Sequence, residues 1–501
     1  MTGSKAVTDT LTTGSGTASL LRPGETCWRR AHARRLAVLV DGDAYFRALR
    51  SAIIRAERSI MILAWEFHAR TDLFPGNDAG DGWPSCLADL LLEAVRRKPA
   101  LEVRILAWKH SVLFALEREF PPTLLLPWNR HPRITFRLDD THPPVASHHQ
   151  KVVVIDDRIA FCGGLDVSAN RWDTPEHRPE DPRRVNPAGR IYGPFHDVQV
   201  AVDDAAATAL GDLARERWRR ATGVALVAPE GASDPWPEWL LPDMGDIEVG
   251  VARTEPAWAG APGAREVERL YLESLRQAKR HVYIENQYLT SDSIAEALVE
   301  SLSGHRGPEV VLVVPLRASG WLEEPTMGVA RARLLQRLRA ADRHRRLAVF
   351  HPVGPDGTRV NLHSKVMVVD DALLRIGSSN LANRSMGLDT ECDIAVEAQE
   401  RADIAVAVTG VRNRLLSEHL GCRPGDVAAA ISRTGSLIGA IEWLRGGERT
   451  LRPLRLSDRT TGSWVPETRV FDPDHPVDPA ELILEAVPPW SRLLWRNGKA
   501  A

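Results

Sequence analysis

Two copies of one short pattern, each reading H-x-K-x4-D, lie 214 residues apart in the chain. Its fixed residues are His149, Lys151 and Asp156 in the first copy and His363, Lys365 and Asp370 in the second. Histidine serves as a nucleophile or as a general acid and base, and lysine is a point charge for phosphoryl oxygens. Only seven lysines occur in the chain, against 57 arginines, so two lysines inside one repeated pattern are unexpected from composition.

Two histidines and two lysines that converge on one cleft suit phosphoryl transfer. One imidazole attacks phosphorus and carries a covalent phosphohistidine, and the other protonates the leaving alcohol and then activates the incoming water or alcohol. The two ammonium groups stabilise charge on the non-bridging oxygens. Because these side chains supply both charge and proton transfer, we expect neither a metal ion nor a cofactor.

The pattern also assigns different tasks to its three residue types. In a strand, residues i and i+2 project to the same face, so His and Lys should point together above a sheet. The two aspartates of the pattern, five residues beyond Lys at the strand end, are expected to fix local structure. Polar side chains after the Gly-led turns that follow are expected to complete a phosphate-binding site: Asp166, Asn170, Ser379 and Asn380.

Each half offers a carboxylate downstream that could hold an imidazole in the correct tautomer. These are Asp197 and Glu391. Asp393 shares a strand face with Glu391, so the sequence does not fully separate the two, although Glu391 is preferred. Three further histidines near the first motif are expected at the surface or in a supporting layer: His148, His177 and His196.

The repeat extends well beyond the motifs and predicts the fold. Strand-like passages alternate with helical ones in both halves, which indicates an α/β class. The runs 152–155 and 366–369 are uniformly apolar, as in strands covered on both faces. We therefore expect two homologous α/β lobes, each a mixed central sheet flanked by helices, related by a pseudo-twofold axis and sharing one active-site cleft.

The expected organisation has five parts. They are a disordered tail (1–30), a first lobe (31–227), a linker rich in Pro, Gly and Ala (228–245), a second lobe (246–421) and a helical, Pro-rich extension packed on the lobes (422–501). The internal twofold already provides the symmetry that a dimer would, so oligomeric state is not predicted.

The overall composition restricts the classes of binding partner and the cellular compartment that we expect. A formal net charge of −2 gives no broad electrostatic surface for nucleic acid, so none is expected as a partner. Five scattered cysteines without C-x-x-C spacing favour a reducing compartment. No signal peptide or membrane span is recognisable, which predicts a cytoplasmic protein with at most peripheral contact at the inner membrane face.

Longer motifs around these residues resemble the phospholipase D superfamily, and most closely its eukaryotic-type enzymes. The matching segments are Gly163-Gly164-Leu165-Asp166 with Asn170-Arg171-Trp172-Asp173, Ile284-Glu285-Asn286-Gln287-Tyr288, and Ile376-Gly377-Ser378-Ser379-Asn380. The resemblance runs from about residue 38 to about residue 485. Unlike that family, the chain shows no membrane-targeting module before the first lobe.

The resemblance implies a role for each site residue. His149 would be the nucleophile and His363 the general acid and base. Lys151, Lys365 and Asn380 would bind phosphate, and Asp197 and Glu391 would orient the two histidines. The residues alone do not say which histidine attacks.

The resulting functional hypothesis is a phosphodiesterase that hydrolyses phosphatidylcholine-like glycerophospholipids to phosphatidate and a free head-group alcohol. Its substrate would lie in a membrane surface, and water or a small alcohol would be the acceptor, so transphosphatidylation is a second outcome. The alternatives, in order, are a cardiolipin-synthase-like phosphatidyltransferase, a superfamily nuclease and a non-catalytic phospholipid-binding protein. Near-neutral charge disfavours the nuclease, and intact His and Lys at both motifs disfavour the binding protein.

Overall fold

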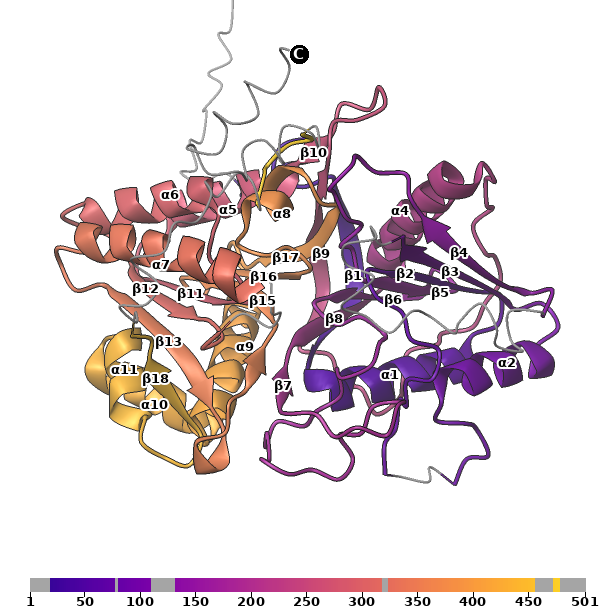
Figure 1. The fold of residues 1–501 in the computed structure, drawn as a ribbon, viewed down its shortest axis with the longest axis horizontal. Helices are drawn as coiled ribbons and strands as arrows, with labels where there is room; N and C mark the ends of the chain where they lie inside the picture. Colours follow the sequence, from indigo (N-terminus) through magenta and orange to yellow (C-terminus); the bar gives the residue numbers. More distant parts are fainter. Residues whose placement is uncertain (1–18, 77–79, 110–130, 318–322, 456–471, 478–501) are drawn as a thin grey trace, which may run out of the picture.

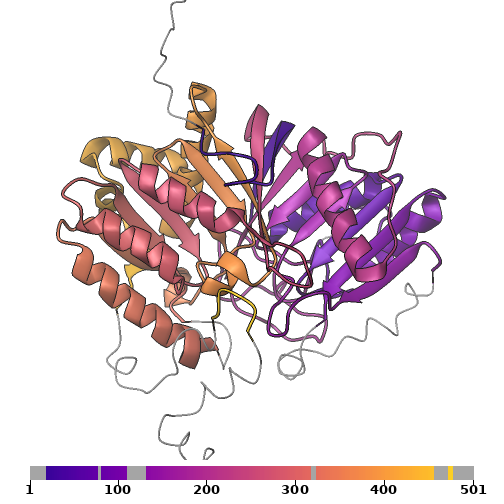
Figure 2. The same ribbon diagram turned by 90° about the horizontal axis from the view of Figure 1, so that it is seen from above.

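The computed structural model describes residues 19–76, 80–109, 131–317, 323–455 and 472–477. One mixed sheet of 16 strands runs through this part of the chain (Figure 1). Helices lie against both of its faces, as the view from above also shows (Figure 2). The fold class is α/β, as the alternating strand and helix patterns predicted.

The first half contributes a mixed set of strands and three long helices. Its strands are β1 (Arg29–Val40), β2 (Ser59–Ala64), β3 (Glu102–Trp108), β4 (Ile134–Asp139), β5 (Val152–Ile155), β6 (Ile159–Gly163), β7 (Phe195–His196) and β8 (Val198–Asp203). Its helices are α1 (Asp41–Arg55), α2 (Leu87–Arg97) and α4 (Asp204–Thr222). Across the sheet the order is β1-β8-β6-β5-β2-β3-β4.

The second half repeats this arrangement with additional elements. Its strands are β9 (Met244–Glu255), β10 (Ala264–Arg265), β11 (His281–Asn286), β12 (Glu309–Val313), β13 (Leu347–Val353), β14 (Asn361–Leu362), β15 (Lys365–Val369), β16 (Leu373–Gly377), β17 (Glu391–Glu397) and β18 (Thr450–Pro453). Its helices are α5 (Glu266–Gln277), α6 (Asp292–Ser303), α7 (Glu323–Ala341), α8 (Asn383–Gly387), α9 (Ala402–Leu420), α10 (Pro424–Thr434) and α11 (Leu437–Leu444). The strand order is β9-β17-β16-β15-β11-β12-β13-β18.

The two halves are joined through their long first strands. β1 and β9 pair antiparallel, from Arg29 opposite Val251 to Leu36 opposite Met244. This pairing makes the sheet continuous, whereas the sequence predicted a separate sheet in each lobe. An unpaired strand of 12 residues would expose a row of backbone donors and acceptors, and pairing satisfies them.

The core explains why the motif strands are apolar throughout. Val152 and Val154 pack in a cluster that includes α4 and α9, while Val153 and Ile155 pack on the opposite face against α1 and α2. Strand β15 is likewise buried on both faces. These strands lie between helical layers, as their sequences predicted. Among the described helices, none combines the length and apolar character needed to cross a membrane.

The N-terminal segment is ordered earlier than expected. Ser19 Oγ donates to Glu397 Oε2 at 2.7 Å, and Leu20, Leu21 and Cys27 are buried. The prediction of a disordered tail reaching residue 30 is therefore wrong for residues 19–30, because the apolar side chains there fill a gap beside β9. Residues 1–18 lie outside the described part of the chain.

The C-terminal extension packs on the second half. The predicted helical passage forms α10 and α11, and β18 then adds to the edge of the sheet beside β13. Farther along, the buried Asp472 accepts from the backbone of Asn383 and Arg384. The expected linker 228–245 is irregular until β9 begins. The Pro-rich tail with Trp490 and Trp495 falls outside the described residues.

Candidate active site

The two motifs lie together because each is hydrogen-bonded to a segment of the opposite half. The backbone N–H of His149 donates to the carbonyl of Thr390 at 3.0 Å, and that of His363 donates to the carbonyl of His196 at 2.8 Å. The short strands β7 and β14 also pair in parallel. Both histidines are thus fixed by residues that lie far away in the sequence.

The strands of the motifs begin later than the sequence predicted. β5 starts at Val152, after Lys151, and β15 starts at Lys365. The histidines therefore precede the strands, so the prediction that His and Lys lie within one strand is wrong, although each lysine still lies beside the histidine of its motif. Since the histidines precede the strands, the alternation of side chains along a strand does not orient them. Their backbone hydrogen bonds to the opposite half do so.

Each imidazole contacts a carboxylate from the other half. His149 Nδ1 lies 3.0 Å from both oxygens of Glu391, and His363 Nδ1 lies 2.6 Å from Asp197 Oδ2. A carboxylate beside Nδ1 holds the ring proton there and leaves Nε2 for a substrate. The two carboxylates named from sequence are thus in contact with the histidines, but in a crossed arrangement that the sequence did not reveal.

Asp393, the alternative to Glu391, has other partners. Its Oδ2 accepts from Arg375 Nε at 2.9 Å and from Ser379 Oγ at 2.7 Å. These three side chains are fully buried beneath the site. Glu391 is therefore the carboxylate that faces the imidazole.

Burial and neighbouring charge keep both imidazoles neutral. Burial lowers the pKa of His149 well below 6.5, and the ammonium groups of Lys151 and Lys365 lower it further. The pKa of His363 is lowered well below 6.5 for the same reasons, with Lys365 the strongest of the positive charges that lower it. Burial also raises the pKa of Asp197 and Glu391 above their ordinary values. A neutral ring keeps a lone pair on one nitrogen, as nucleophilic attack requires.

The first lysine has a carboxylate partner. Lys151 Nζ lies 3.3 Å from Asp166 Oδ2, donates to the carbonyl of His149 at 3.1 Å and sits 5.3 Å from the centre of the Trp65 ring. Lys151 and Asp166 are both about 2% exposed. The ammonium is thereby held at a fixed point beside His149.

The second lysine has only neutral partners in hydrogen-bond contact. Lys365 Nζ donates to Gln287 Oε1 at 3.2 Å and to the carbonyl of His363, and it lies 3.1 Å from His363 Nδ1. Burial lowers the pKa of Lys365 to about 7, although Asp197 opposes this effect. An anionic phosphate beside this group would favour its charged form.

Different groups support the two orienting carboxylates. Glu391 accepts from the hydroxyls of Ser378 and Ser385, the latter at 2.6 Å. Asp197 accepts from the backbone N–H of Val198 at 2.7 Å. A Cβ on Gly164 would lie 2.0 Å from Asp197 Oδ1, so only glycine lets that carboxylate occupy its place.

The four predicted phosphate-binding side chains have different surroundings in the structure. Asp166 pairs with Lys151 and accepts from the Trp65 backbone N–H. The Ser379 hydroxyl is engaged by Asp393, and Asn170 is exposed on its loop. Asn380 is different: its Oδ1 is buried and has no hydrogen-bond partner among the described residues. Of the four, Asn380 is the one whose side-chain oxygen the described residues leave without a donor.

The aspartates of the motifs hold the backbone of the neighbouring strand. Asp156 accepts from the N–H groups of residues 57, 58 and 59 at 2.7–2.8 Å. Asp370 accepts from those of residues 279, 280 and 281 at 2.5–2.8 Å. Each carboxylate thus orders the entry into the strand beside its motif, β2 or β11. Neither is directed at the histidines.

Sequence reasoning underestimated several neighbours of the site. Trp65 packs edge-on against His149, with ring centres 5.7 Å apart. Arg171 lies over the Phe195 ring and forms an ion pair with Glu66 at 2.9 Å, and its charge helps to lower the pKa of His363. The quoted motifs contain Arg171 and Gln287, so the signal was present without an assigned role.

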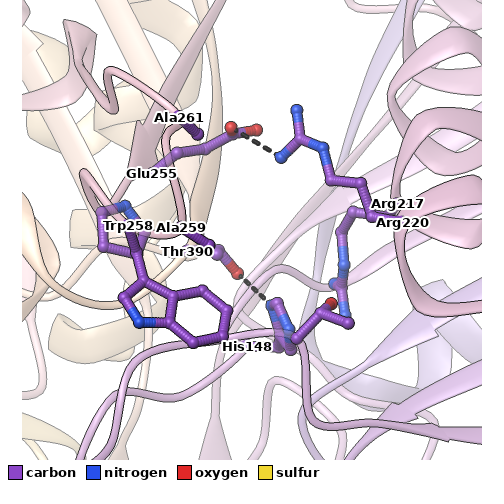
Figure 3. A pocket seen from close by; sticks show the side chains of 10 residues that line it. His148, Arg217, Arg220, Glu255, Trp258, Ala259, Ala261 and Thr390 are labelled. Carbon is purple, nitrogen blue, oxygen red and sulfur yellow. Dashed lines mark hydrogen bonds and ion pairs between the residues drawn. The ribbon is translucent and has the colours of Figure 1, made fainter.

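A cavity of about 360 Å³ lies on the other side of the first motif segment (Figure 3). His148 and Thr390, which flank the site residues His149 and Glu391 in sequence, line this cavity together with Arg217 and Trp258. The four His and Lys side chains of the motifs do not line it. We therefore locate the chemistry by the converging side chains and not by this cavity.

The arrangement places two neutral imidazoles and two buried lysines at one point. Positive side chains there favour an anionic ligand over a metal cation. Such an arrangement is chemically able to supply one nucleophile, one proton carrier and positive charge for phosphoryl oxygens.

Comparison with known proteins relates this chain to lipid enzymes. A family model described as cardiolipin synthase, PLD-like domain, matches residues 271–408, where PLD abbreviates phospholipase D. Phospholipase D A of Dictyostelium discoideum is 23% identical over 77% of this chain and 35% of its own length. Phospholipase D alpha 1 of Carica papaya is 24% identical over 55% of this chain and 49% of its own length. The chain thus spans between about a third and a half of these relatives.

The fold has a counterpart among solved structures. The phosphatidylserine synthase of Haemophilus influenzae superposes with a TM-score of 0.50 at 14% sequence identity, covering 77% of this chain and 88% of that one. At this identity the likeness concerns the fold alone. The family match, the sequence relatives and the two H-x-K motifs show that the chain belongs to the phospholipase D superfamily.

Proposed function

We propose that this protein is a phosphodiesterase that cleaves the head group from glycerophospholipids through a phosphohistidine intermediate. The observation that carries the proposal is the crossed pair of imidazole–carboxylate contacts, His149 with Glu391 and His363 with Asp197. Both histidines have one nitrogen fixed and the other available for a substrate. Two buried lysines beside them supply positive charge for a phosphate.

In the first step, His149 Nε2 attacks phosphorus and the bond from phosphorus to the head-group oxygen breaks. For this step His363 takes up a second proton, on Nε2, which the negative charge of the bound phosphate favours, and it gives that proton to the leaving oxygen so that the head group departs as an alcohol. Lys151 and Lys365 stabilise the charge that develops on the non-bridging oxygens. The phosphatidyl group is then held on His149 by a phosphorus–nitrogen bond.

In the second step, His363 takes a proton from an incoming water molecule, whose oxygen attacks phosphorus as the bond to His149 breaks. The products are phosphatidate and the free enzyme. A small alcohol in place of water yields a new phosphatidyl ester by the same route. Hydrolysis and transfer therefore share the intermediate and differ only in the acceptor.

The names of the relatives support a phospholipid as the substrate. Three of them, from a slime mould, a yeast and a plant, are called phospholipase D. Phosphatidylcholine is the substrate we propose first, met at a membrane surface by peripheral contact. The matching family model is described as cardiolipin synthase, and this favours phosphatidyl transfer to an alcohol as the second candidate.

The decisive experiment incubates the purified chain with phosphatidylcholine vesicles and a chelator. About 5–10% ethanol is added as an acceptor that competes with water. We expect both phosphatidate and phosphatidylethanol, because the intermediate accepts either nucleophile. The matched control is His363→Ala, which keeps the fold but lacks the proton carrier. Cleavage of single-stranded DNA without turnover of any phospholipid would replace this proposal with a nuclease.

A further inference from the structure

A second cluster of ionisable side chains is buried between the halves, and the proposed catalysis uses none of these side chains. Its members are Asp41 at the start of α1, His177 in the loop before β7, His196 in β7 and Glu418 near the end of α9. None of them is more than 7% exposed. Of the two positions expected for His177 and His196, the surface is wrong because both are buried, whereas a supporting position agrees with the hydrogen bond from the backbone of His363 to His196.

Four ligand atoms converge in this cluster, all within 4.8 Å of one another. Glu418 Oε1 lies 2.7 Å from His196 Nδ1 and 3.1 Å from His177 Nε2. Asp41 Oδ1 lies 3.0 Å from His196 Nδ1, and Asp41 Oδ2 lies 3.8 Å from His177 Nε2. Ligands bound at about 2.0–2.2 Å in a tetrahedron are about 3.3–3.5 Å apart, so the observed distances lie on both sides of that value.

Both imidazoles have a carboxylate on their outer nitrogen. His177 Nδ1 lies 2.9 Å from Asp173 Oδ2, and His196 Nε2 lies 3.0 Å from Glu285 Oε2. A metal-binding histidine is ordinarily held this way, because the outer carboxylate fixes the tautomer and makes the inner nitrogen a better ligand. The inner atoms, His177 Nε2 and His196 Nδ1, are the two that face Asp41 and Glu418.

Two of the converging atoms lack a hydrogen bond. Asp41 Oδ2 and His196 Nδ1 are buried and without a hydrogen-bond partner among the described residues. His196 Nδ1 nevertheless lies within 3.0 Å of one oxygen of Asp41 and one of Glu418, whereas no described donor lies within hydrogen-bond distance of Asp41 Oδ2. One cation between the four groups would satisfy both atoms.

The charge balance also calls for a cation. Four carboxylates gather here, those of Asp41, Asp173, Glu285 and Glu418; Arg184 forms an ion pair with Asp173, and a third histidine, His419, lies 3.0 Å from Glu285. Two protons on the histidines or one divalent ion would each add two positive charges. Protonated imidazole rings and a bound metal ion differ in what they do for Asp41 Oδ2. Protons on the rings leave this oxygen without a donor, whereas a metal ion would bind it.

We propose that Asp41, His177, His196 and Glu418 bind one divalent first-row transition ion, with Zn²⁺ the first choice. Two imidazole nitrogens and two carboxylate oxygens are ligands that Zn²⁺ accepts in closed, four-coordinate sites. The ion would join the first half to α9 of the second. It would also fix His196, whose neighbour Asp197 orients His363.

Metal analysis of the intact protein tests this proposal. The full chain, without a histidine tag, is expressed in zinc-supplemented medium, purified and dialysed against metal-free buffer. We expect about one equivalent of transition metal per chain. X-ray absorption of the same sample should show only nitrogen and oxygen neighbours at about 2.0–2.1 Å.

Variants locate the ion within the chain. We expect His177→Gln and Glu418→Gln to retain less than a tenth of the metal. The matched control is His148→Gln, since His148 is equally buried and lies 3.1 Å from one carboxylate, Asp139, but is not part of this cluster. The control should keep its metal content.

Two results would overturn the proposal. One is wild-type protein with less than a tenth of an equivalent of any transition metal, whose melting temperature is unchanged when it is refolded with zinc instead of chelator. The other is an absorption spectrum with sulfur at about 2.3 Å, which would place the metal on the free cysteines. Both measurements use wild-type protein, so they decide the question even if the variants fail to fold, and neither depends on phospholipase activity.

Discussion

The two halves have the same strand order, yet they hold their lysines differently. Lys151 lies against the Asp166 carboxylate, while Lys365 donates to the neutral Gln287 amide. Asn380 follows its Gly-led turn as Asp166 follows the first one, so one half carries a carboxylate where the other carries an amide. The first half therefore neutralises its lysine internally. In the second half no carboxylate of the described residues lies in hydrogen-bond contact with the lysine, although Asp197 acts on it from farther away.

The orienting carboxylates differ in a related way. Two serine hydroxyls donate to Glu391, whereas Asp197 relies on a backbone N–H and on the space left by Gly164. Ser378 and Gly164 are equivalent, each following the first residue of the turn. The two halves thus share one strand order, but the groups that donate hydrogen bonds to their orienting carboxylates differ.

The largest expected effect separates the two histidines. His149→Ala and His363→Ala should each lower turnover of phosphatidylcholine by about a thousandfold or more. A p-nitrophenyl phosphodiester needs no proton on its leaving group, so His363→Ala should still release about one equivalent of p-nitrophenol in a burst and retain phosphate on His149, as measured by mass spectrometry. His149→Ala should give no burst. The reverse pattern would exchange the two roles.

The lysines should differ in stability as well as in catalysis. Lys151→Met leaves the buried Asp166 carboxylate unpaired, so we expect the free energy of unfolding to fall by about 3 kcal/mol. Lys365→Met leaves the Gln287 amide behind and removes a charge that acts on Asp197 only from beyond hydrogen-bond contact, so we expect a smaller loss of about 1 kcal/mol. Urea titration of both variants measures the difference. Equal losses would show that Asp166 does not compensate the charge of Lys151.

The pH profile tests the neutral surroundings of Lys365. Because burial lowers its pKa to about 7, Lys365 is charged below that pH and loses its charge above it. We expect kcat/KM to fall as pH rises through 7, by about tenfold per unit once the group is mostly neutral.

The same profile can be shifted by copying the first half. Asn380 occupies the turn position that Asp166 has in the first half, so Asn380→Asp places a carboxylate at the position equivalent to the partner of Lys151 and should move the alkaline limb about one unit higher. Asn170→Asp adds the same charge at an exposed position and serves as the control. An unmoved limb in Asn380→Asp would assign the titration to another group.

The smallest expected effect concerns the hydroxyls on Glu391. Ser378→Ala removes one donor from a buried carboxylate and should lower the free energy of unfolding by about 1 kcal/mol and kcat by about tenfold. Ser385→Ala should behave similarly. If both variants match wild type in steady-state assays and in thermal unfolding, the serine hydroxyls contribute neither to stability nor to the orientation of Glu391.

The sequence predicted the fold class, the repeat and the carboxylates that contact the two histidines. It could not show that Glu391 serves His149 and Asp197 serves His363, because same-half and opposite-half pairing leave identical patterns. It also could not show that the Asp166 carboxylate contacts an ammonium, since that depends on packing between distant segments. The continuous sheet likewise depends on β1–β9 pairing, which no local pattern encodes.

The crossed contacts have a consequence for the nascent chain. His149 is separated by 242 residues from Glu391, the carboxylate that holds its tautomer. Asp197 precedes its histidine, His363, by 166 residues. Ribosomal synthesis proceeds from the N-terminus, so a partly made chain carries a nucleophile without its orienting group and without a proton donor. A lipid-cleaving activity of the kind proposed would therefore stay silent until the second half has folded onto the first.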